Sequence, residues 1–173
     1  MRVGWGFLLL VCTLARAVPL YDFETESGWK QHPDGGVEVR FQIDSTLVKE
    51  GEKALRLFYK DAPPHWGNLV GSCFVPANAV ALRFWLHVST AHPSAKMHIW
   101  LIEPDGDMWL QQVTVRGKSV GELPPGWHEV TMPITGFQFD GRGNRRREIL
   151  SVDRMLIGCN FGTMEVTVDC MEW

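Results

Sequence analysis

Short runs of alternating apolar and polar residues occupy most of this chain, and they constrain its fold more than any other feature. Such runs occur at 37–43, 55–60, 69–75, 82–88, 97–103, 108–115, 127–132, 151–159 and 164–171. Turns rich in glycine and proline, such as Pro104-Asp-Gly-Asp107, separate them, and that turn predicts a hairpin with Gly106 at a positive φ. Many period-two strands without a long stretch of helical period are typical of an all-β sandwich or barrel.

Residues 1–17 have the three-part pattern of a secretory signal peptide. Arg2 supplies a positive start, an apolar run covers 7–14, and Ala15-Arg-Ala17 has the A-x-A form of a cleavage site. The apolar run is shorter than the about 20 residues that a membrane span needs. We therefore expect a signal peptide over 1–17, one domain over 18–173, and a secreted protein that is extracellular or periplasmic.

The charge of the chain argues against two classes of partner. A formal net charge of −3 gives general attraction neither to nucleic acid nor to an anionic membrane surface. The one basic cluster, Arg142-Gly-Asn-Arg-Arg-Arg147, lies in a glycine-rich segment and is interpreted as a solvated loop. We expect a monomer without a nucleic-acid or membrane partner.

The cysteines that follow the signal peptide are Cys73, Cys159 and Cys170. Because their number is odd, a secreted chain retains at least one thiol outside an intramolecular disulfide. Cys159 and Cys170 lie on neighbouring predicted strands and could pair, while the even spacing of Cys170 from Val166 and Val168 favours a small buried residue. No C-x-x-C sequence is present, so neither a thiolate zinc site nor a redox pair is supported.

Two predicted strands, 82–88 and 97–102, carry aromatic and basic side chains opposite their apolar ones. If the strands share a sheet, these side chains lie on its face away from the core: Arg83, Trp85, His87, His98 and Trp100. Tryptophan offers a rigid flat surface to the apolar face of a sugar ring, and arginine and histidine hydrogen-bond to hydroxyls. The pattern therefore predicts a carbohydrate-binding platform. The alternative is that the tryptophans are core residues. Their solvent exposure distinguishes a binding role from a packing role.

Neighbouring segments offer further candidates for the platform. The strand at 108–115 adds either Trp109 and Gln111 or Leu110 and Gln112, because its parity is ambiguous. Trp66 follows Pro63-Pro-His65 and is a candidate for a loop rim, although packing is an alternative for Trp66 and Trp109. Trp29 and Trp127 stand beside glycine at strand starts and are interpreted as structural.

Catalytic motifs are absent from the sequence. There is no G-x-S-x-G, no H-E-x-x-H and no glycine-rich phosphate loop. Acids such as Glu103, Asp105 and Asp107 stand in or beside a predicted turn, where aspartate commonly shapes the backbone. We therefore expect a non-catalytic chain.

Six short motifs follow one another along the chain: Tyr21–Glu24, Gly28-Trp29, Glu50–Leu57, Leu82–Leu86, Pro124–Val130 and Val166–Asp169. Their order resembles that of the galactose-binding-like jelly-roll modules, the carbohydrate-binding modules attached to many secreted glycoside hydrolases. The resemblance covers nearly all of residues 18–173. It implies a jelly-roll β-sandwich of two antiparallel sheets with neighbouring termini. It also implies that the chain binds a polysaccharide or glycan without catalysing a reaction.

The resemblance also implies a structural calcium ion that ties the first strand to the last. Matched residue by residue, its ligands are Glu24, Glu50, the carbonyl of Lys53, and Asp169. Calcium takes six to eight hard oxygens, and distant carboxylates converge on one ion only if the chain termini are neighbours. The alternative is that Glu24 and Glu50 are solvated acids and that backbone amides hold Asp169.

Two other functions remain open on the sequence alone. Jelly-rolls of this kind also serve as protein-interaction or assembly modules. A stand-alone polysaccharide lyase or hydrolase is the other alternative, which turnover of polysaccharide would distinguish from binding.

Overall fold

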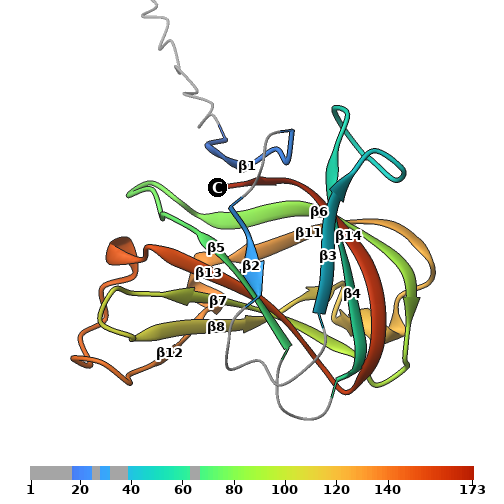
Figure 1. Cartoon of the computed structure of the whole chain (residues 1–173). Coiled ribbons are helices and arrows are strands. Elements are labelled where there is room, and N and C mark those ends of the chain that lie inside the picture. Colours follow the sequence, from blue (N-terminus) through green and yellow to red (C-terminus); the bar gives the residue numbers. More distant parts are fainter. Residues whose placement is uncertain (1–16, 25–27, 32–38, 63–66) are drawn as a thin grey trace, which may run out of the picture.

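The computed structural model describes residues 17–24, 28–31, 39–62 and 67–173 (Figure 1). The signal-peptide prediction therefore concerns residues that lie almost entirely outside this part of the chain.

The strands are β1 (Pro19–Tyr21), β2 (Lys30–Gln31), β3 (Val39–Asp44), β4 (Ala54–Ala62), β5 (Gly67–Ser72), β6 (Ala81–Ala91), β7 (Lys96–Ile102), β8 (Met108–Gln112), β9 (Thr114–Val115), β10 (Lys118–Ser119), β11 (Gly126–Pro133), β12 (Gln138–Asp140), β13 (Arg154–Asn160) and β14 (Gly162–Glu172). Single 3-10 turns occur at η2 (Val120–Glu122), η3 (Ile134–Gly136) and η4 (Ile149–Ser151). No helix in the described ranges is long and apolar enough to cross a membrane.

Two antiparallel sheets make up the molecule (Figure 1). The first, here called the β6 sheet, has the strand order β11-β6-β14-β4-β3, with β1 also paired to β14. The second, the β7 sheet, has the order β12-β8-β7-β13-β5-β2. The strands β9 and β10 form a separate ribbon. This architecture confirms the predicted all-β jelly-roll sandwich.

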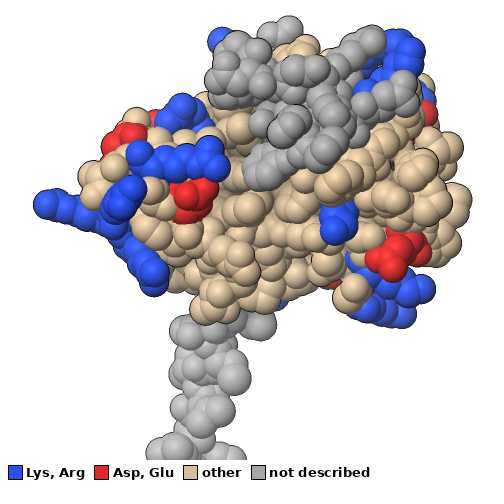
Figure 2. Space-filling view, turned by 90° about the horizontal axis from the view of Figure 1, so that it is seen from below, with Lys and Arg blue, Asp and Glu red and all other residues tan. Residues whose placement is uncertain are grey.

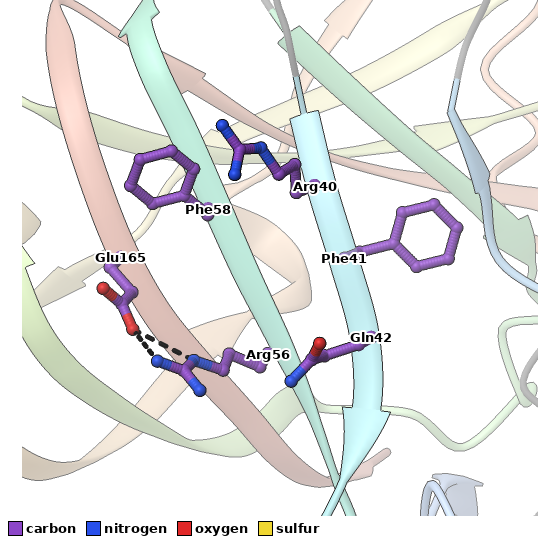
Figure 3. Close-up of a pocket in the computed structure, with 6 residues that line it drawn as sticks. All are labelled: Arg40, Phe41, Gln42, Arg56, Phe58 and Glu165. Atoms are coloured by element: carbon purple, nitrogen blue, oxygen red, sulfur yellow. Dashed lines mark hydrogen bonds and ion pairs between the residues drawn. The ribbon is translucent and has the colours of Figure 1, made fainter.

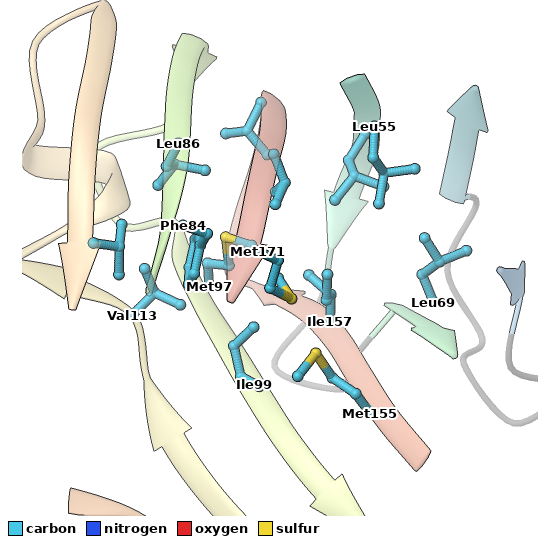
Figure 4. Close-up of a cluster of buried hydrophobic side chains, with 14 of the residues drawn as sticks. Leu55, Leu69, Phe84, Leu86, Met97, Ile99, Val113, Met155, Ile157 and Met171 are labelled. Atoms are coloured by element: carbon cyan, nitrogen blue, oxygen red, sulfur yellow. The ribbon is translucent and has the colours of Figure 1, made fainter. Parts of the chain in front are cut away.

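The core lies between the two sheets, where the apolar half of each alternating strand points. Leu82, Phe84 and Leu86 enter it from β6, and Met97 and Ile99 enter it from β7 (Figure 4). Each of these side chains is at most 2% exposed. Complete burial of a large apolar side chain contributes about 1.5–3 kcal/mol, so the alternating pattern itself drives the two sheets together.

The two ends of the described chain are neighbours. Val18 and Trp173 exchange backbone hydrogen bonds of 3.0 and 2.9 Å, and β1 pairs with β14. The first and last strands therefore lie side by side in the β6 sheet, as the sequence resemblance implies.

The predicted hairpin at Pro104–Asp107 joins β7 to β8, and Gly106 has a φ of 96° there. Its acids also hold the arginine-rich segment that follows β12. Asp107 accepts backbone N–H bonds from Gly143 at 2.6 Å and from Arg145 at 2.7 Å. The arginine side chains of this segment are exposed, and Figure 2 shows basic side chains around acidic ones at this end of the molecule. The segment is a solvated loop, as predicted.

The three described cysteines are free thiols. Cys159 belongs to β13 in the β7 sheet and Cys170 to β14 in the β6 sheet, so the possible pairing of these two residues is wrong. Burial raises the pKa of Cys73 and of Cys159 to about 12, which keeps both thiols protonated. They pack as small apolar groups.

Candidate functional site

The structure separates the two strands that the sequence analysis placed on one platform. β6 pairs with β11 and β14, whereas β7 pairs with β8 and β13 in the opposite sheet. Arg83, Trp85 and His87 therefore lie on the outer face of one sheet, and His98 and Trp100 lie on the outer face of the other. The single platform is wrong because two consecutive strands with the same period can pack across a core as well as pair.

Trp100 is a packing residue rather than an open surface. It is 2% exposed and clusters with Ile102 and Leu156 on the outer side of the β7 sheet. His98 lies beside it with ring centroids 5.5 Å apart. Burial, and secondarily the charge of Lys96, lowers the pKa of His98 to about 4, so this imidazole is neutral at physiological pH.

The remaining platform candidates lie elsewhere. Trp109 is opposite Leu101 and Gln111 is opposite Ile99, so both belong to the core-facing side of β8. The Trp109 indole donates to the Glu103 carboxylate at 2.7 Å, which fixes it as a structural residue. Trp66 lies outside the described residues.

The outer face of the β6 sheet, here called the β6 face, carries an aligned row of aromatic and polar side chains across five strands. Strand pairing aligns them in the order Trp127, His87, Thr167, Arg56 and Gln42, on β11, β6, β14, β4 and β3. Neighbouring strands are about 4.8 Å apart, so the row is roughly 19 Å long. One end is aromatic, the middle carries a hydroxyl, and the other end carries guanidinium and amide groups.

The arginine end of the row opens into a hollow of about 220 Å³. Figure 3 shows Arg40, Arg56, Phe58 and Glu165 around it, with Phe41 pointing away at the edge strand. Arg56 donates through Nε to Glu165 at 3.0 Å and through a second nitrogen to the same oxygen, and this contact raises the pKa of Arg56. The guanidinium of Arg40 lies 5.3 Å from the centre of the Phe58 ring. The hollow thus combines one aromatic face with oriented hydrogen-bonding groups.

The aromatic end is built by β6 and β11. The rings of His87 and Trp127 meet edge to face with centroids 5.1 Å apart. Burial, and secondarily the charge of His128, lowers the pKa of His87. Trp85 stands in the adjacent row, where the Lys49 ammonium lies 4.1 Å above its ring. A flat ligand on Trp85 must therefore displace Lys49, whereas the Trp127 edge carries no such cover among the contacts of the described residues.

Thr167 forms the floor in the middle of the row. It points outward yet is only 1% exposed, so neighbouring side chains cover it. Its hydroxyl oxygen has no hydrogen-bond partner among the described residues. A buried polar group without a partner costs about 1–3 kcal/mol, and a ligand can satisfy this hydroxyl only where the side chains that cover it move aside.

Two parts of this face were missed by the sequence analysis. Trp127 was interpreted as structural, and the β4 residues Arg56 and Phe58 were assigned no role. The outward position of Arg56 and Phe58 is visible in their alternation with Leu55 and Leu57. Their alignment with β6 depends on the pairing of β14 with both β4 and β6, which alternation does not encode.

Asp169, a candidate calcium ligand, is completely buried beside the turn at 49–53. Its Oδ2 accepts the backbone N–H groups of Lys49 at 2.8 Å and Glu50 at 3.0 Å. Its Oδ1 accepts the backbone N–H of Cys170 at 2.8 Å. Both oxygens of Asp169 therefore accept amide donors, two at Oδ2 and one at Oδ1, so the amides leave Oδ1 a further lone pair for a cation.

Glu24 approaches the same turn from the first strand region. Its Oε1 accepts the backbone N–H of Glu52 at 2.8 Å and of Lys53 at 3.3 Å. Gly51, with a φ of 74°, leaves the space that this oxygen enters, since a Cβ there would lie 2.0 Å from it. The predicted convergence on the turn is present, and it consists of carboxylate–amide bonds.

Among the described residues, acidic side chains close enough to share a metal ion are Glu103, Asp105 and Asp107. Amides of the loop after β12 bind these carboxylates, including that of Asn144 at 3.0 Å to Asp105 and that of Glu148 at 3.2 Å to Glu103. The cluster anchors that loop.

No family model and no curated protein matches the sequence. The fold, in contrast, is similar to several solved structures. A family 11 carbohydrate-binding module from Clostridium thermocellum, solved in complex with a β-1,3-1,4-mixed-linked tetrasaccharide, has a TM-score of 0.70 at 14% identity, covering 91% of this chain and 95% of that one. The xylan-binding domain of a Paenibacillus barcinonensis protein has a TM-score of 0.56 at 14% identity, covering 91% and 92%.

The same fold occurs within a larger enzyme. A β-1,2-glucanase from Parabacteroides distasonis matches with a TM-score of 0.60 at 14% identity over 90% of this chain and 23% of the enzyme. At these identities the likeness concerns the fold. The chain thus has the β-sandwich fold of carbohydrate-binding modules, which is the resemblance that its sequence motifs indicated.

Proposed function

We propose that this chain is a non-catalytic carbohydrate-binding module whose β6 face binds a glycan chain. The observation that carries the proposal is the aligned row from Trp127 to Gln42, with the buried hydroxyl of Thr167 at its centre. Two neighbours in fold support it, because one was solved with a bound tetrasaccharide and another is described as a xylan-binding domain.

In this proposal the glycan lies across the strands. Trp127 stacks on the apolar face of one sugar ring, Phe58 stacks on another once Arg40 moves off its ring, and His87, Thr167 and Arg56 bind hydroxyls between them. Backbone pairing fixes the spacing of these groups, and Glu165 orients the Arg56 guanidinium. Little conformational freedom is lost on binding, which favours affinity.

The carboxylates near the row favour binding over hydrolysis. A glycosidase needs two available carboxyl groups about 5–10 Å apart. Glu165 is paired with Arg56, and both oxygens of Asp169 accept backbone N–H bonds. We therefore propose that the module binds a polysaccharide without cleaving it, as one domain over 18–173 that acts outside the cell.

A glycan array probed with residues 18–173 tests the function, and the array includes mixed-linkage β-glucan and xylan fragments. We expect binding to a polysaccharide class and no release of reducing ends from it. Trp127→Ala should weaken that binding by about tenfold, equivalent to about 1.4 kcal/mol. Trp29→Phe, a change at a buried ring far from the row, is the control and should bind normally. Turnover of the glycan, or protein binding without glycan binding, would support the enzyme or assembly alternatives.

Structural calcium is a separate proposal, and it rests on the sequence resemblance. The ion would be held by Glu24, Glu50, the Lys53 carbonyl and Asp169. The ion would share Asp169 with the amide donors that already bind both of its oxygens. Thermal unfolding in calcium and in a chelator decides between the two. A calcium-dependent rise in melting temperature supports the ion, and identical curves mean that amide bonds alone hold the turn.

A further inference from the structure

A second hollow lies at the corner where β13 turns into β14. It is an open hollow of about 480 Å³, and its lining residues come from three separate segments: Pro93, Ser94, Lys96, Ser119, Glu122 and Phe161. It involves none of the residues of the β6 row.

Phe161 is in a conformation that its side chain disfavours. Its φ is 63°, in the left-handed region that a bulky L-residue rarely adopts. Its ring is 40% exposed, so core packing does not explain its presence. Asparagine or glycine would occupy this position with less strain. An exposed aromatic ring at a strained backbone position is a candidate contact for a ligand.

The backbone around Phe161 is held in place by close contacts. The N–H of His92 donates to the Thr163 carbonyl at 2.8 Å, and that of Gly121 donates to the Ala95 carbonyl at 3.0 Å. A Cβ at Gly121 would lie 2.3 Å from the His92 carbonyl oxygen, and a Cβ at Gly162 would lie 2.7 Å from the His92 Cβ. The three segments therefore present a preformed hollow rather than one that must be assembled on binding.

Charged side chains stand beside the Phe161 ring in the hollow. Glu122 accepts hydrogen bonds from the Ser119 backbone N–H at 2.8 Å and from its hydroxyl at 2.6 Å. These bonds lower the pKa of Glu122, so the carboxylate stays ionised. The Lys96 ammonium lies 5.7 Å from the centre of the Phe161 ring. One cation and one anion beside an exposed ring suit a neutral ligand with both an apolar face and hydroxyl groups.

We propose that this corner hollow is a second binding site for a neutral saccharide. Phe161 stacks on the sugar, and Lys96 and Glu122 bind its hydroxyls. The class of ligand rests on the proposed function, whereas the place of the site rests on the strained ring and its frame. Two separate sites on one chain would raise the avidity for a long polysaccharide above that for a short oligosaccharide.

The test compares Phe161→Asn with Trp127→Ala by calorimetric titration with a short oligosaccharide of the class found on the array. Phe161→Asn should unfold at a higher temperature, because asparagine tolerates the left-handed conformation, and should lose one of the two binding events. Trp127→Ala should lose the other. Phe74→Ala, at an exposed ring outside both sites, is the control and should retain both.

The outcomes separate the two proposals. If Phe161→Asn binds like the wild type while Trp127→Ala abolishes binding, the corner site is wrong and the β6 face stands. If Phe161→Asn lowers the melting temperature, the ring has a packing role and the argument from strain fails. If no oligosaccharide binds at all, both proposals are wrong.

Discussion

Thr167 is the residue that links the stability of the β6 sheet to its proposed function. Its hydroxyl is buried without a partner among the described residues, at the centre of an aromatic and arginine row. A fold selected for stability alone gains nothing from a hydroxyl there, since an apolar side chain of the same shape avoids the desolvation cost. We interpret it as a group reserved for a ligand hydroxyl.

Thr167→Val replaces this hydroxyl with a methyl group of nearly the same size. We expect the free energy of unfolding to rise by about 1 kcal/mol, because an unsatisfied group is removed, and glycan affinity to fall. Urea unfolding and calorimetric titration measure the two effects. A destabilised variant with unchanged affinity would mean that the hydroxyl is satisfied within the folded chain.

His98 predicts a pH dependence of stability. Its folded-state pKa of about 4 lies below its ordinary value of 6.5, so the unfolded chain binds a proton at pH 5 that the folded chain does not. The free energy of unfolding therefore falls as the pH is lowered from 7 to 5, by roughly 1 kcal/mol from this group after allowance for its partial exposure. Urea unfolding at both pH values should show a smaller loss for His98→Gln. An equal loss in the two proteins would exclude His98 as the source.

The alternation of apolar and polar residues predicted correctly on which side of its strand most side chains lie. Leu82 and Phe84 are buried in the core, and Arg83 points outward. Exposure was less predictable, because Trp100 points outward yet is covered within a second apolar cluster. The cover over an outward side chain comes from distant segments, so local alternation carries no information about it.

At the scale of elements, every run of alternating residues corresponds to a strand or a pair of strands. No alternating run marks β1, β2, β10 or β12, whose two or three residues are too few to show a period. The predicted platform required β6 and β7 to share a sheet, whereas their connection crosses from one sheet to the other. Both sheets need the same inward apolar pattern, so the pattern cannot distinguish a neighbour in the sheet from a partner across the core.

The turn at 49–53 binds residues from near both ends of the chain. Its backbone N–H groups donate to Glu24, which follows β1, and to Asp169 in β14. Gly51→Ala should destabilise the fold by about 2–3 kcal/mol, because a Cβ at a positive φ would also displace the Glu24 carboxylate. Gly117→Ala is the matched control. Gly117 has a φ of 78° with open space around it, and the backbone cost alone is about 1 kcal/mol.

Urea unfolding of the two variants compares these costs. A Gly51→Ala variant that is no less stable than Gly117→Ala would show that the contact between Glu24 and the turn contributes nothing to the stability of the fold.

At the scale of the whole molecule, the sandwich presents two outer faces of different character. The outer face of the β7 sheet, here called the β7 face, carries the apolar cluster of Trp100, Ile102 and Leu156, and the β6 face carries the polar and aromatic row. The order of short sequence motifs was sufficient to indicate this fold, because those motifs mark turns and core positions that any such sandwich needs. The motifs did not predict the position of the proposed binding row, since it depends on which strands β14 joins.

The most direct test of the central claim is an NMR titration of ¹⁵N-labelled residues 18–173 with an oligosaccharide of the class found on the array. The account predicts shifts along the row from Trp127 through His87 and Thr167 to Arg56, with a further set near Phe161. Shifts confined to the β7 face around Trp100 and Leu156, with none along the row, would contradict it.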